Sequence, residues 1–160
     1  MTFAVSLPDP EATETLARQV AAALPEIPAG WLILLEGELG SGKSTFARAL
    51  LRAYGHEGPV PSPTYTLVEP YSLPGFDAYH IDLYRIADDG ELEFLGWSDL
   101  DNGLRLVEWP ARVPHLYAGS DLLVSLSYAA EGRLAELSAS SERGAELIRN
   151  LPDYSTSYQP

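Results

Sequence analysis

An apolar run, a glycine-rich turn and the start of a helix follow one another directly in LLEGELGSGKSTFARALL, from Leu34 to Leu51. The run WLILL, which leads into the turn, is typical of a fully buried strand and is closed by Gly37. The segment KSTFARALLRAYG after the turn predicts a helix that ends at Gly55. A strand, a glycine turn and a helix in this order predict an α/β fold with the turn at the carboxyl edge of a sheet.

The turn matches the phosphate-binding pattern G-x-x-x-x-G-K-[ST] through Gly37, Gly42, Lys43 and Ser44. Glycines allow a tight bend in which several backbone N–H groups point into one hollow, and the following helix directs its positive end there. Lys43 is the only lysine in the chain, since the other nine of the ten basic residues are arginines. An ammonium group on a flexible stem suits the β- and γ-phosphates of a nucleotide, whereas a planar guanidinium has a different reach. The sequence therefore predicts a nucleoside triphosphate site.

The expected nucleotide contacts lie in the turn and the first helical residues: Glu38, Leu39, Gly40, Ser41, Gly42, Lys43, Ser44 and Thr45. The hydroxyl oxygen of Ser44 is also expected to bind Mg²⁺. A dinucleotide site is not expected, because GELGSG does not fit the pattern G-x-G-x-x-G.

Two acidic residues at the ends of apolar strands are candidate partners of that metal ion. Asp82 follows AYHI and Glu108 follows LRLV, so both are expected at the sheet edge where the turn lies. Mg²⁺ needs only one or two protein carboxylates, because it keeps several waters. We expect Asp82 to bind the metal directly or through water, and Glu108 to complete the metal shell or to orient the attacking water. Which acid is the direct ligand stays open, and either could instead cap a neighbouring turn.

Four residues near these acids allow more than one interpretation. Thr64, in the proline-rich segment PSPTYTLVEPY, is a candidate for sensing the γ-phosphate and its metal, or else packs in a rigid turn. His80 is more typical of a core histidine than of a ligand. Arg85 could reach a phosphate, although a structural ion pair is favoured. Trp109 fits core packing and an exposed stacking surface equally well.

The rest of the chain predicts a mixed sheet with helices on its faces. A helix is expected from Pro10 to Leu24, strands in FDAYHIDLYRI and LRLVEWP, and a short helix with an acidic first turn in DDGELEFLGW. Five prolines within EGPVPSPTYTLVEPYSLPG indicate a long ordered loop or an edge segment.

The C-terminal part differs in its pattern. Alternation over residues 122–128, followed by Glu131-Gly132, predicts an antiparallel hairpin, and SERGAELIRNL predicts a final helix. We therefore expect one α/β domain over residues 1–151, a three-layer P-loop nucleotide-hydrolase-like mixed sheet with flanking helices and a C-terminal hairpin. Residues 152–160 are expected to form a disordered tail.

The overall charge restricts the possible partners. Ten basic and 23 acidic residues give a net charge of −13. Such a surface repels phosphate backbones over about one Debye length, ~8 Å at physiological salt, and we expect no extensive direct binding of nucleic acid. The chain has no cysteine, which excludes disulfides and thiolate metal sites. The apolar runs are too short to cross a bilayer, and the N-terminus lacks a basic region before its apolar patch, so we expect a cytoplasmic protein with no membrane contact.

Four blocks of the sequence, in their order and spacing, resemble the TsaE (YjeE) family, the small bacterial ATPases of tRNA threonylcarbamoyladenosine biosynthesis. The blocks are GELGSGKSTF (37–46), SPTYTLVEPY (62–71), HIDLYRIADDGELEFLG (80–96) and LVEWP (106–110). The similarity runs from about Leu7 to the hairpin after residue 120, and the last three blocks together are highly specific. The region after about Ser140 matches no family pattern.

The resemblance implies a protein that binds and hydrolyses ATP with Mg²⁺ and assists a heterodimer of two related proteins, TsaB and TsaD. That heterodimer transfers a threonylcarbamoyl group to the adenosine beside the anticodon of certain tRNAs. Because no internal arginine finger is evident, we expect slow hydrolysis alone and faster turnover on the partner. A group supplied in trans can raise such rates about 10³–10⁵-fold.

The resemblance also implies roles for individual residues. Lys43 and Ser44 match the phosphate and metal positions, Thr64 a switch-like loop, and Asp82 and Glu108 the metal-associated acids. In EATETLA, Thr13 matches a threonine near the base, whereas Ala17 stands where the family usually has glycine.

Three other functions are alternatives. A small-molecule kinase would need an acceptor pocket and usually an arginine-bearing lid, but Arg85, Arg105 and Arg112 are scattered along the chain. A GTPase usually needs the motif N-K-x-D, for which no lysine is left besides Lys43. A nucleotide-gated binding module, in which hydrolysis is incidental, would keep full partner stimulation after Glu108→Ala.

Overall fold

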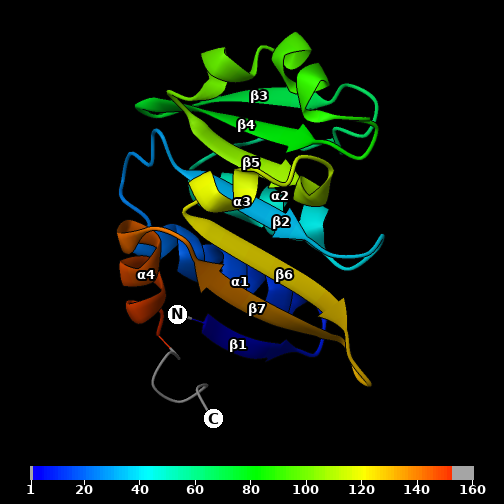
Figure 1. Cartoon of the computed structure of the whole chain (residues 1–160). Helices are drawn as coiled ribbons and strands as arrows, with labels where there is room; N and C mark the ends of the chain where they lie inside the picture. The colour runs from blue at the N-terminus through cyan, green and yellow to red at the C-terminus, as the bar shows by residue number, and fades with distance from the viewer. Residues whose placement is uncertain (1, 153–160) are drawn as a thin grey trace.

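Seven strands form one mixed sheet in the computed structural model, which describes residues 2–152 (Figure 1). The strands are β1 (Thr2–Leu7), β2 (Leu32–Glu36), β3 (Val68–Leu73), β4 (Phe76–Asp82), β5 (Leu104–Glu108), β6 (Leu122–Tyr128) and β7 (Arg133–Ala139). Their order across the sheet is β1-β7-β6-β2-β5-β4-β3. The central strands β6, β2, β5 and β4 are parallel, whereas β3, β7 and β1 each run antiparallel to the neighbour that they join. The carboxyl ends of the four parallel strands therefore meet at one edge.

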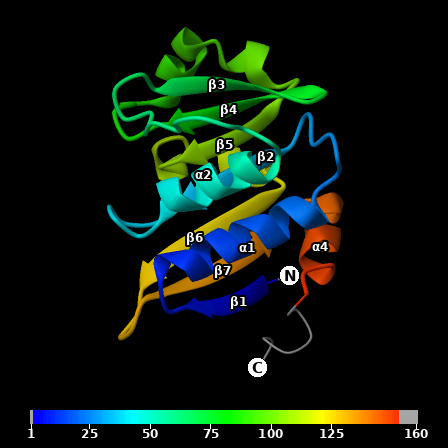
Figure 2. The ribbon, with the colours of Figure 1, turned by 180° about the vertical axis from the view of Figure 1, so that it is seen from behind.

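Helices cover both faces of this sheet. The α-helices are α1 (Pro10–Ala23), α2 (Lys43–Ala53), α3 (Leu116–Gly119) and α4 (Glu142–Arg149), and the 3₁₀-helices are η1 (Asp89–Leu95), η2 (Trp97–Leu100) and η3 (Pro110–Arg112). Helices α1 and α2 lie side by side on one face, which is turned to the viewer in Figure 2. The expected three-layer α/β arrangement is confirmed.

The central strand β2 shows why two apolar layers form. All four residues of its LILL run are buried, and successive side chains point to opposite faces. Ile33 and Leu35 join the cluster that packs against α1 and α2, whereas Leu32 and Leu34 join a second cluster on the other face. A continuous apolar run, rather than an alternating one, is what a parallel strand covered on both sides requires.

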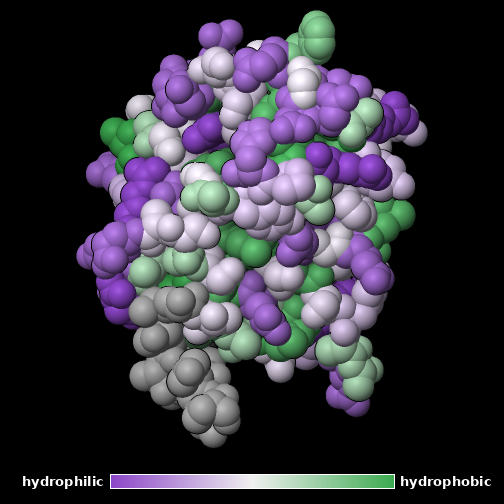
Figure 3. Space-filling view, in the orientation of Figure 1, coloured by the Kyte–Doolittle hydropathy of each residue, from purple (hydrophilic) through white to green (hydrophobic). Residues whose placement is uncertain are grey.

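The second face is covered only in part. On β6 and β7 its side chains include Ser125, Ser127, Glu136 and Ser138, none of which is buried. Figure 3 shows hydrophobic residues scattered among hydrophilic ones on this side of the molecule. The two strands of the hairpin are antiparallel and have one solvent-exposed face, which accounts for the alternating pattern of that segment. No helix in the described part of the chain is long and apolar enough to cross a membrane.

Most of the elements expected from the sequence are present. The hairpin turns through residues 129–132, and the proline-rich segment is a loop followed by the edge strand β3. The segment DDGELEFLGW was expected to form a short helix, and it forms the 3₁₀-helix η1, which Asp88 caps at its N-terminus and Gly96 ends. Strand β1 was not expected, because its pairing partner β7 lies far along the sequence. Of the tail expected over residues 152–160, only Pro152 is among the described residues.

Helix α4 is fixed to the sheet by a buried carboxylate. Asp121 accepts hydrogen bonds from the Leu32 N–H, the Ser141 hydroxyl and the Arg143 guanidinium, all at 2.8–2.9 Å. Burial by itself would raise the pKa of Asp121, but these hydrogen bonds together hold it below its usual value. Gly144 packs so closely that an added Cβ would lie 1.9 Å from the Asp121 carbonyl oxygen.

We therefore predict that Gly144→Ala lowers the free energy of unfolding by about 1–3 kcal/mol, because the added methyl group overpacks this contact. Gly119→Ala is the matched control, since nothing lies within 4 Å of its added Cβ. That control is expected to stay within about 0.5 kcal/mol of the parent chain. Urea unfolding of the three proteins measures both values, and equal stabilities would contradict the packing described for α4.

Candidate functional site

A cleft of about 200 Å³ lies at the carboxyl edge of the parallel strands. It brings together residues from the turn after β2, the start of α2, the loop before β3, and the ends of β4 and β5. Its lining comprises Leu39, Gly40, Gly42, Lys43, Ser44, Thr45, Ser62, Thr64, Asp82, Glu108 and Trp109. The candidate metal and switch residues of the sequence thus share one cleft with Lys43, whereas Glu38 and Ser41 do not line it.

The turn between β2 and α2, residues 37–42, is hereafter called the phosphate loop. Gly40 and Gly42 have φ values of 80° and 112°, in the left-handed region that glycine adopts without strain. A Cβ at Gly37 would lie 2.4 Å from the Leu126 carbonyl oxygen, so the chain passes too close to β6 for any side chain there. The first N–H groups of α2 begin directly after Gly42, where no side chain caps the helix. This arrangement leaves a hollow of backbone donors suited to an anion.

Lys43 is almost fully buried at the floor of the cleft. Its ammonium group donates to the carbonyl oxygens of Gly37 at 2.5 Å and Glu38 at 3.1 Å, and it lies 4.4 Å from the ring centroid of Trp109. Burial lowers the pKa of Lys43, and the negative charges of Glu108 and Asp82 oppose that change. The lysine is therefore held by the loop itself and faces two carboxylates.

The two carboxylates come from neighbouring strands. Asp82 and Glu108 are register partners on β4 and β5, so their side chains lie next to each other on one face. Glu108 Oε2 accepts hydrogen bonds from Ser44 Oγ at 3.3 Å and from His80 Nε2 at 2.5 Å. Both bonds are long-range, so they join the start of α2 to two strands of the sheet. His80, interpreted from the sequence as a core histidine, is indeed fully buried but also positions Glu108.

The carboxylate of Asp82 faces the chain that follows it. Its Oδ1 accepts a hydrogen bond from the Tyr84 N–H at 2.8 Å. Burial raises the pKa of Asp82, although that hydrogen bond opposes the shift. Its backbone N–H donates to the Leu67 carbonyl, and Leu67 has a positive φ of 69°. A strained residue in the loop that carries Thr64 is thus tied to the end of β4.

Thr64 and Thr13 line two different cavities beside the phosphate loop. Thr64 lines the cleft and shares a hydrogen bond with Ser62 at 2.8 Å. Thr13, buried on α1, lines a second cavity of about 160 Å³. The two cavities share Gly40, Gly42 and Thr45, so they adjoin each other along the same turn.

The remaining expected nucleotide contacts differ in their environment. Leu39 is 83% exposed at the tip of the loop, whereas Ser41 is 1% exposed, and its hydroxyl has no hydrogen-bond partner among the described residues. Glu38 contributes its carbonyl oxygen, which accepts from the Ser41 N–H as well as from Lys43. Thr45 lines both cavities.

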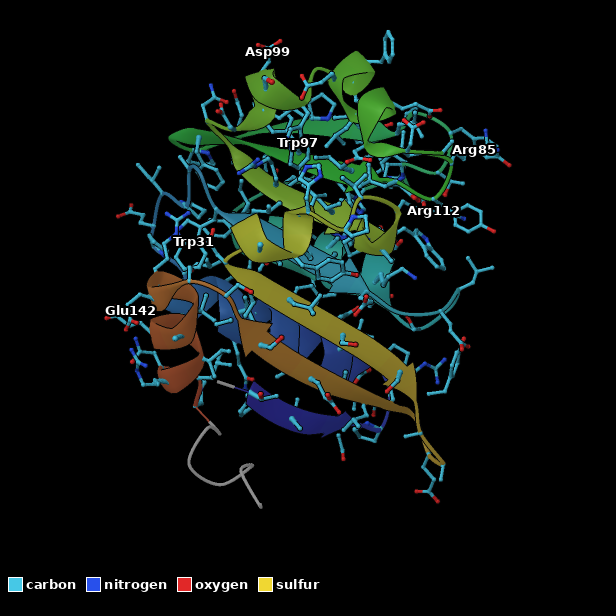
Figure 4. All side chains as sticks on the ribbon, in the orientation of Figure 1. Trp31, Arg85, Trp97, Asp99, Arg112 and Glu142 are labelled. Atoms are coloured by element: carbon cyan, nitrogen blue, oxygen red, sulfur yellow. The ribbon has the colours of Figure 1, made fainter. Side chains whose placement is uncertain are left out.

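Aromatic and arginine side chains lie beside the cleft. The Trp109 ring is 4.9 Å from that of Tyr84, over which the Arg112 guanidinium lies at 5.2 Å. Arg85 lies 4.6 Å from the ring of Tyr65, and Figure 4 shows both arginines on the side of the molecule where the phosphate loop lies. The ion pair expected for Arg85 is not found among the described residues. Arg85 instead makes this cation–π contact with the exposed ring of Tyr65.

The donor set of the cleft suits a hard cation. The Ser44 hydroxyl and the carboxylates of Asp82 and Glu108 offer oxygen atoms, which Mg²⁺ prefers. No cluster of three or more His, Cys, Asp or Glu side chains that could hold a metal ion occurs in the described part of the chain. A cation here would therefore depend on the hydroxyl, on water and on ligand oxygens as well.

Known proteins of one family resemble this chain over most of its sequence. Residues 7–135 match the family model of the threonylcarbamoyl adenosine biosynthesis protein TsaE. The tRNA threonylcarbamoyladenosine biosynthesis protein TsaE of Haemophilus influenzae is 43% identical over 119 residues, 73% of this chain and 75% of the relative. The protein of that name from Synechocystis is 40% identical over 116 residues, 69% of this chain and 71% of the relative.

A solved structure confirms the fold. The crystal structure of Bacillus subtilus YdiB superimposes with a TM-score of 0.73 over 98% of this chain and 96% of that one, at 24% identity. This similarity shows the same arrangement of strands and helices.

We predict that His80 and Glu108 are energetically coupled. In a double-mutant cycle of His80→Leu and Glu108→Gln, the interaction free energy should be about 1.5–3 kcal/mol, as expected for a buried hydrogen bond to a charged group. The matched control pairs His80→Leu with Glu36→Gln, since Glu36 ends β2, two strands away, and bonds Tyr117 instead. Urea unfolding gives all the free energies. Additive effects in the first cycle would contradict the pairing.

Proposed function

Because the chain belongs to the TsaE family, we propose that it binds ATP with Mg²⁺ and hydrolyses it to support tRNA threonylcarbamoyladenosine formation. The step supported is the transfer of the threonylcarbamoyl group to the adenosine beside the anticodon by a TsaB–TsaD-type heterodimer in the cytoplasm. One observation carries the proposal: the phosphate loop, Lys43 and two carboxylates meet in a single cleft.

The loop and helix α2 would bind the phosphates. Backbone N–H groups of Gly42, Lys43 and Ser44 lie where the loop becomes helix, and uncapped donors at this position attract an anion. The Lys43 ammonium, which donates to two loop carbonyls, would move to the β- and γ-phosphate oxygens. Its flexible stem permits this exchange of partners with little change in the loop.

The acidic residues would act beside the phosphates. Ser44 and Asp82 would hold Mg²⁺, with Asp82 binding directly or through a water. When bound, Mg²⁺ would neutralise charge that develops on the phosphate oxygens. Glu108, fixed by His80 and already within reach of the Ser44 hydroxyl, would complete the metal shell or orient the attacking water.

The base and the γ-phosphate would lie in the two adjoining cavities. Thr13 lines the cavity on the α1 side, so we assign the base to that cavity. Thr64 lines the cleft on the side of the carboxylates, where it would sense the γ-phosphate and its metal. Thr45 lines both cavities and would contact the phosphates between them.

Turnover would depend on a protein partner. The lining of the cleft in residues 2–152 includes Lys43 but no arginine, so a further positive group would have to come from outside it. A net charge of −13 disfavours direct binding of the chain to tRNA. Both features favour a protein that acts through the heterodimer.

We predict that Lys43→Ala weakens ATP binding about 10-fold or more, because a charged contact with the phosphates is lost. Glu108→Gln should leave ATP affinity within about threefold of the parent while lowering partner-stimulated turnover at least about 100-fold, as loss of water orientation would do. Calorimetry and phosphate release, with and without a TsaB–TsaD pair, measure these effects. Arg149→Ala, which alters an exposed ion pair on α4, is the control.

The same assay separates the alternatives. A nucleotide-gated binding module would keep full partner stimulation in Glu108→Gln. An isolated chain as fast as the assembled complex would contradict the need for a partner.

A further inference from the structure

The β6–β7 hairpin holds the tip of the phosphate loop through two backbone carbonyls. The Tyr128 hydroxyl donates to the Leu39 carbonyl oxygen at 2.6 Å, and the Arg133 guanidinium donates to the Gly40 carbonyl oxygen at 3.2 Å. These contacts span 89 and 93 residues of sequence. Figure 1 shows the hairpin and the loop after β2 on the same side of the molecule, and Figure 2 agrees.

The two donors form one unit. Tyr128 and Arg133 are register partners at the end of the hairpin, and the guanidinium lies 4.1 Å from the tyrosine ring centroid. Arg133 also donates to the Gly132 carbonyl at 2.9 Å, which holds its side chain close to the turn. A cation–π contact of this kind restricts both side chains.

The hairpin end is itself anchored in the fold. Arg133 pairs with Leu7 at the end of β1. A Cβ at Gly132 would lie 2.2 Å from the Leu7 carbonyl oxygen, so the turn packs directly on the chain that leads into α1. The hydrogen bonds therefore connect the loop tip to the anchored end of the hairpin, where Arg133 also lines the cavity assigned to the base.

The loop tip depends on contacts from the hairpin because its own side chains make few stabilising contacts. Leu39 is 83% exposed, and Gly40 has a φ of 80° and no side chain. Glycine-rich backbone loses more conformational entropy on ordering than any other, so an unrestrained loop would adopt many conformations. Because a peptide unit is planar and trans, holding the Leu39 carbonyl toward Tyr128 turns the Gly40 N–H to the opposite side.

We infer that Tyr128 and Arg133 are positioning residues, which hold the phosphate loop in its anion-binding conformation before nucleotide arrives. The inference rests on the proposed function. Donors that are already in place bind an anion more tightly, because the free energy of binding is then not reduced by the entropy lost on ordering the loop.

The test compares Tyr128→Phe, Arg133→Ala and the double variant with the parent chain. Each single variant should bind ATP with Mg²⁺ about 3- to 10-fold more weakly, the range for loss of one net hydrogen bond, and the double variant, which loses two, should bind it more weakly still. Deuterium exchange in peptides covering residues 36–46 of the nucleotide-free protein should become faster, because the loop samples more conformations. Arg133→Lys keeps one donor and should restore most of the affinity.

Tyr54→Phe is the matched control, because the Tyr54 hydroxyl also donates to a backbone carbonyl, that of Pro25, far from the loop. It should leave ATP affinity and loop exchange unchanged. Unchanged affinity in the double variant overturns the inference. So does weakened affinity with unchanged loop exchange, since that pair of results would indicate a direct contact with the nucleotide. If the parent chain itself binds no ATP, the proposed function fails. If the parent binds ATP and the double variant binds it equally well, only the inference about Tyr128 and Arg133 fails, so the two failures are distinguishable.

Discussion

The shared direction of four neighbouring strands determines where the charged groups of the cleft lie. Because β2, β5 and β4 are parallel and in register, the ends at Leu35, Glu108 and Asp82 stand side by side, and the phosphate loop begins one residue beyond Glu36. Two acids separated by 26 residues of sequence thereby face one lysine. The antiparallel strands β3, β7 and β1 extend the sheet without altering this edge. Strand β7 also carries Arg133, which donates a hydrogen bond to the loop tip.

The cleft concentrates buried charge, which a fold tolerates only when the charges compensate one another. Lys43, Asp82, Glu108 and His80 are all at most 5% exposed. Burial lowers the pKa of the lysine and raises that of the aspartate, so desolvation disfavours both charged forms. Hydrogen bonds to loop carbonyls, to a backbone N–H and to an imidazole offset part of that cost. A ligand with opposite charges in the matching places would offset more, and a magnesium nucleotide has that distribution.

Local patterns were enough to predict much of the site. The glycine turn, Lys43 and Ser44 follow from a contiguous motif, and the two acids follow from their places at strand ends. The pairing of His80 with Glu108 could not be predicted, because it depends on the register between β4 and β5. Strand β1 and the contacts of Tyr128 depend on elements far apart in sequence, for which no local pattern exists. The short segment after Asp88 was expected to be helical, and only its tighter 3₁₀ form was not foreseen.

The proposed function requires that the cleft beside Lys43 bind the triphosphate of ATP together with Mg²⁺. Calorimetric titration of the unaltered protein with ATP, in buffers with Mg²⁺ and with a chelator, tests it most directly. We expect saturable binding at one site that weakens when Mg²⁺ is removed, because the oxygen donors of the cleft then lose their cation. Absence of binding in magnesium buffer, from protein shown to be folded, would contradict it.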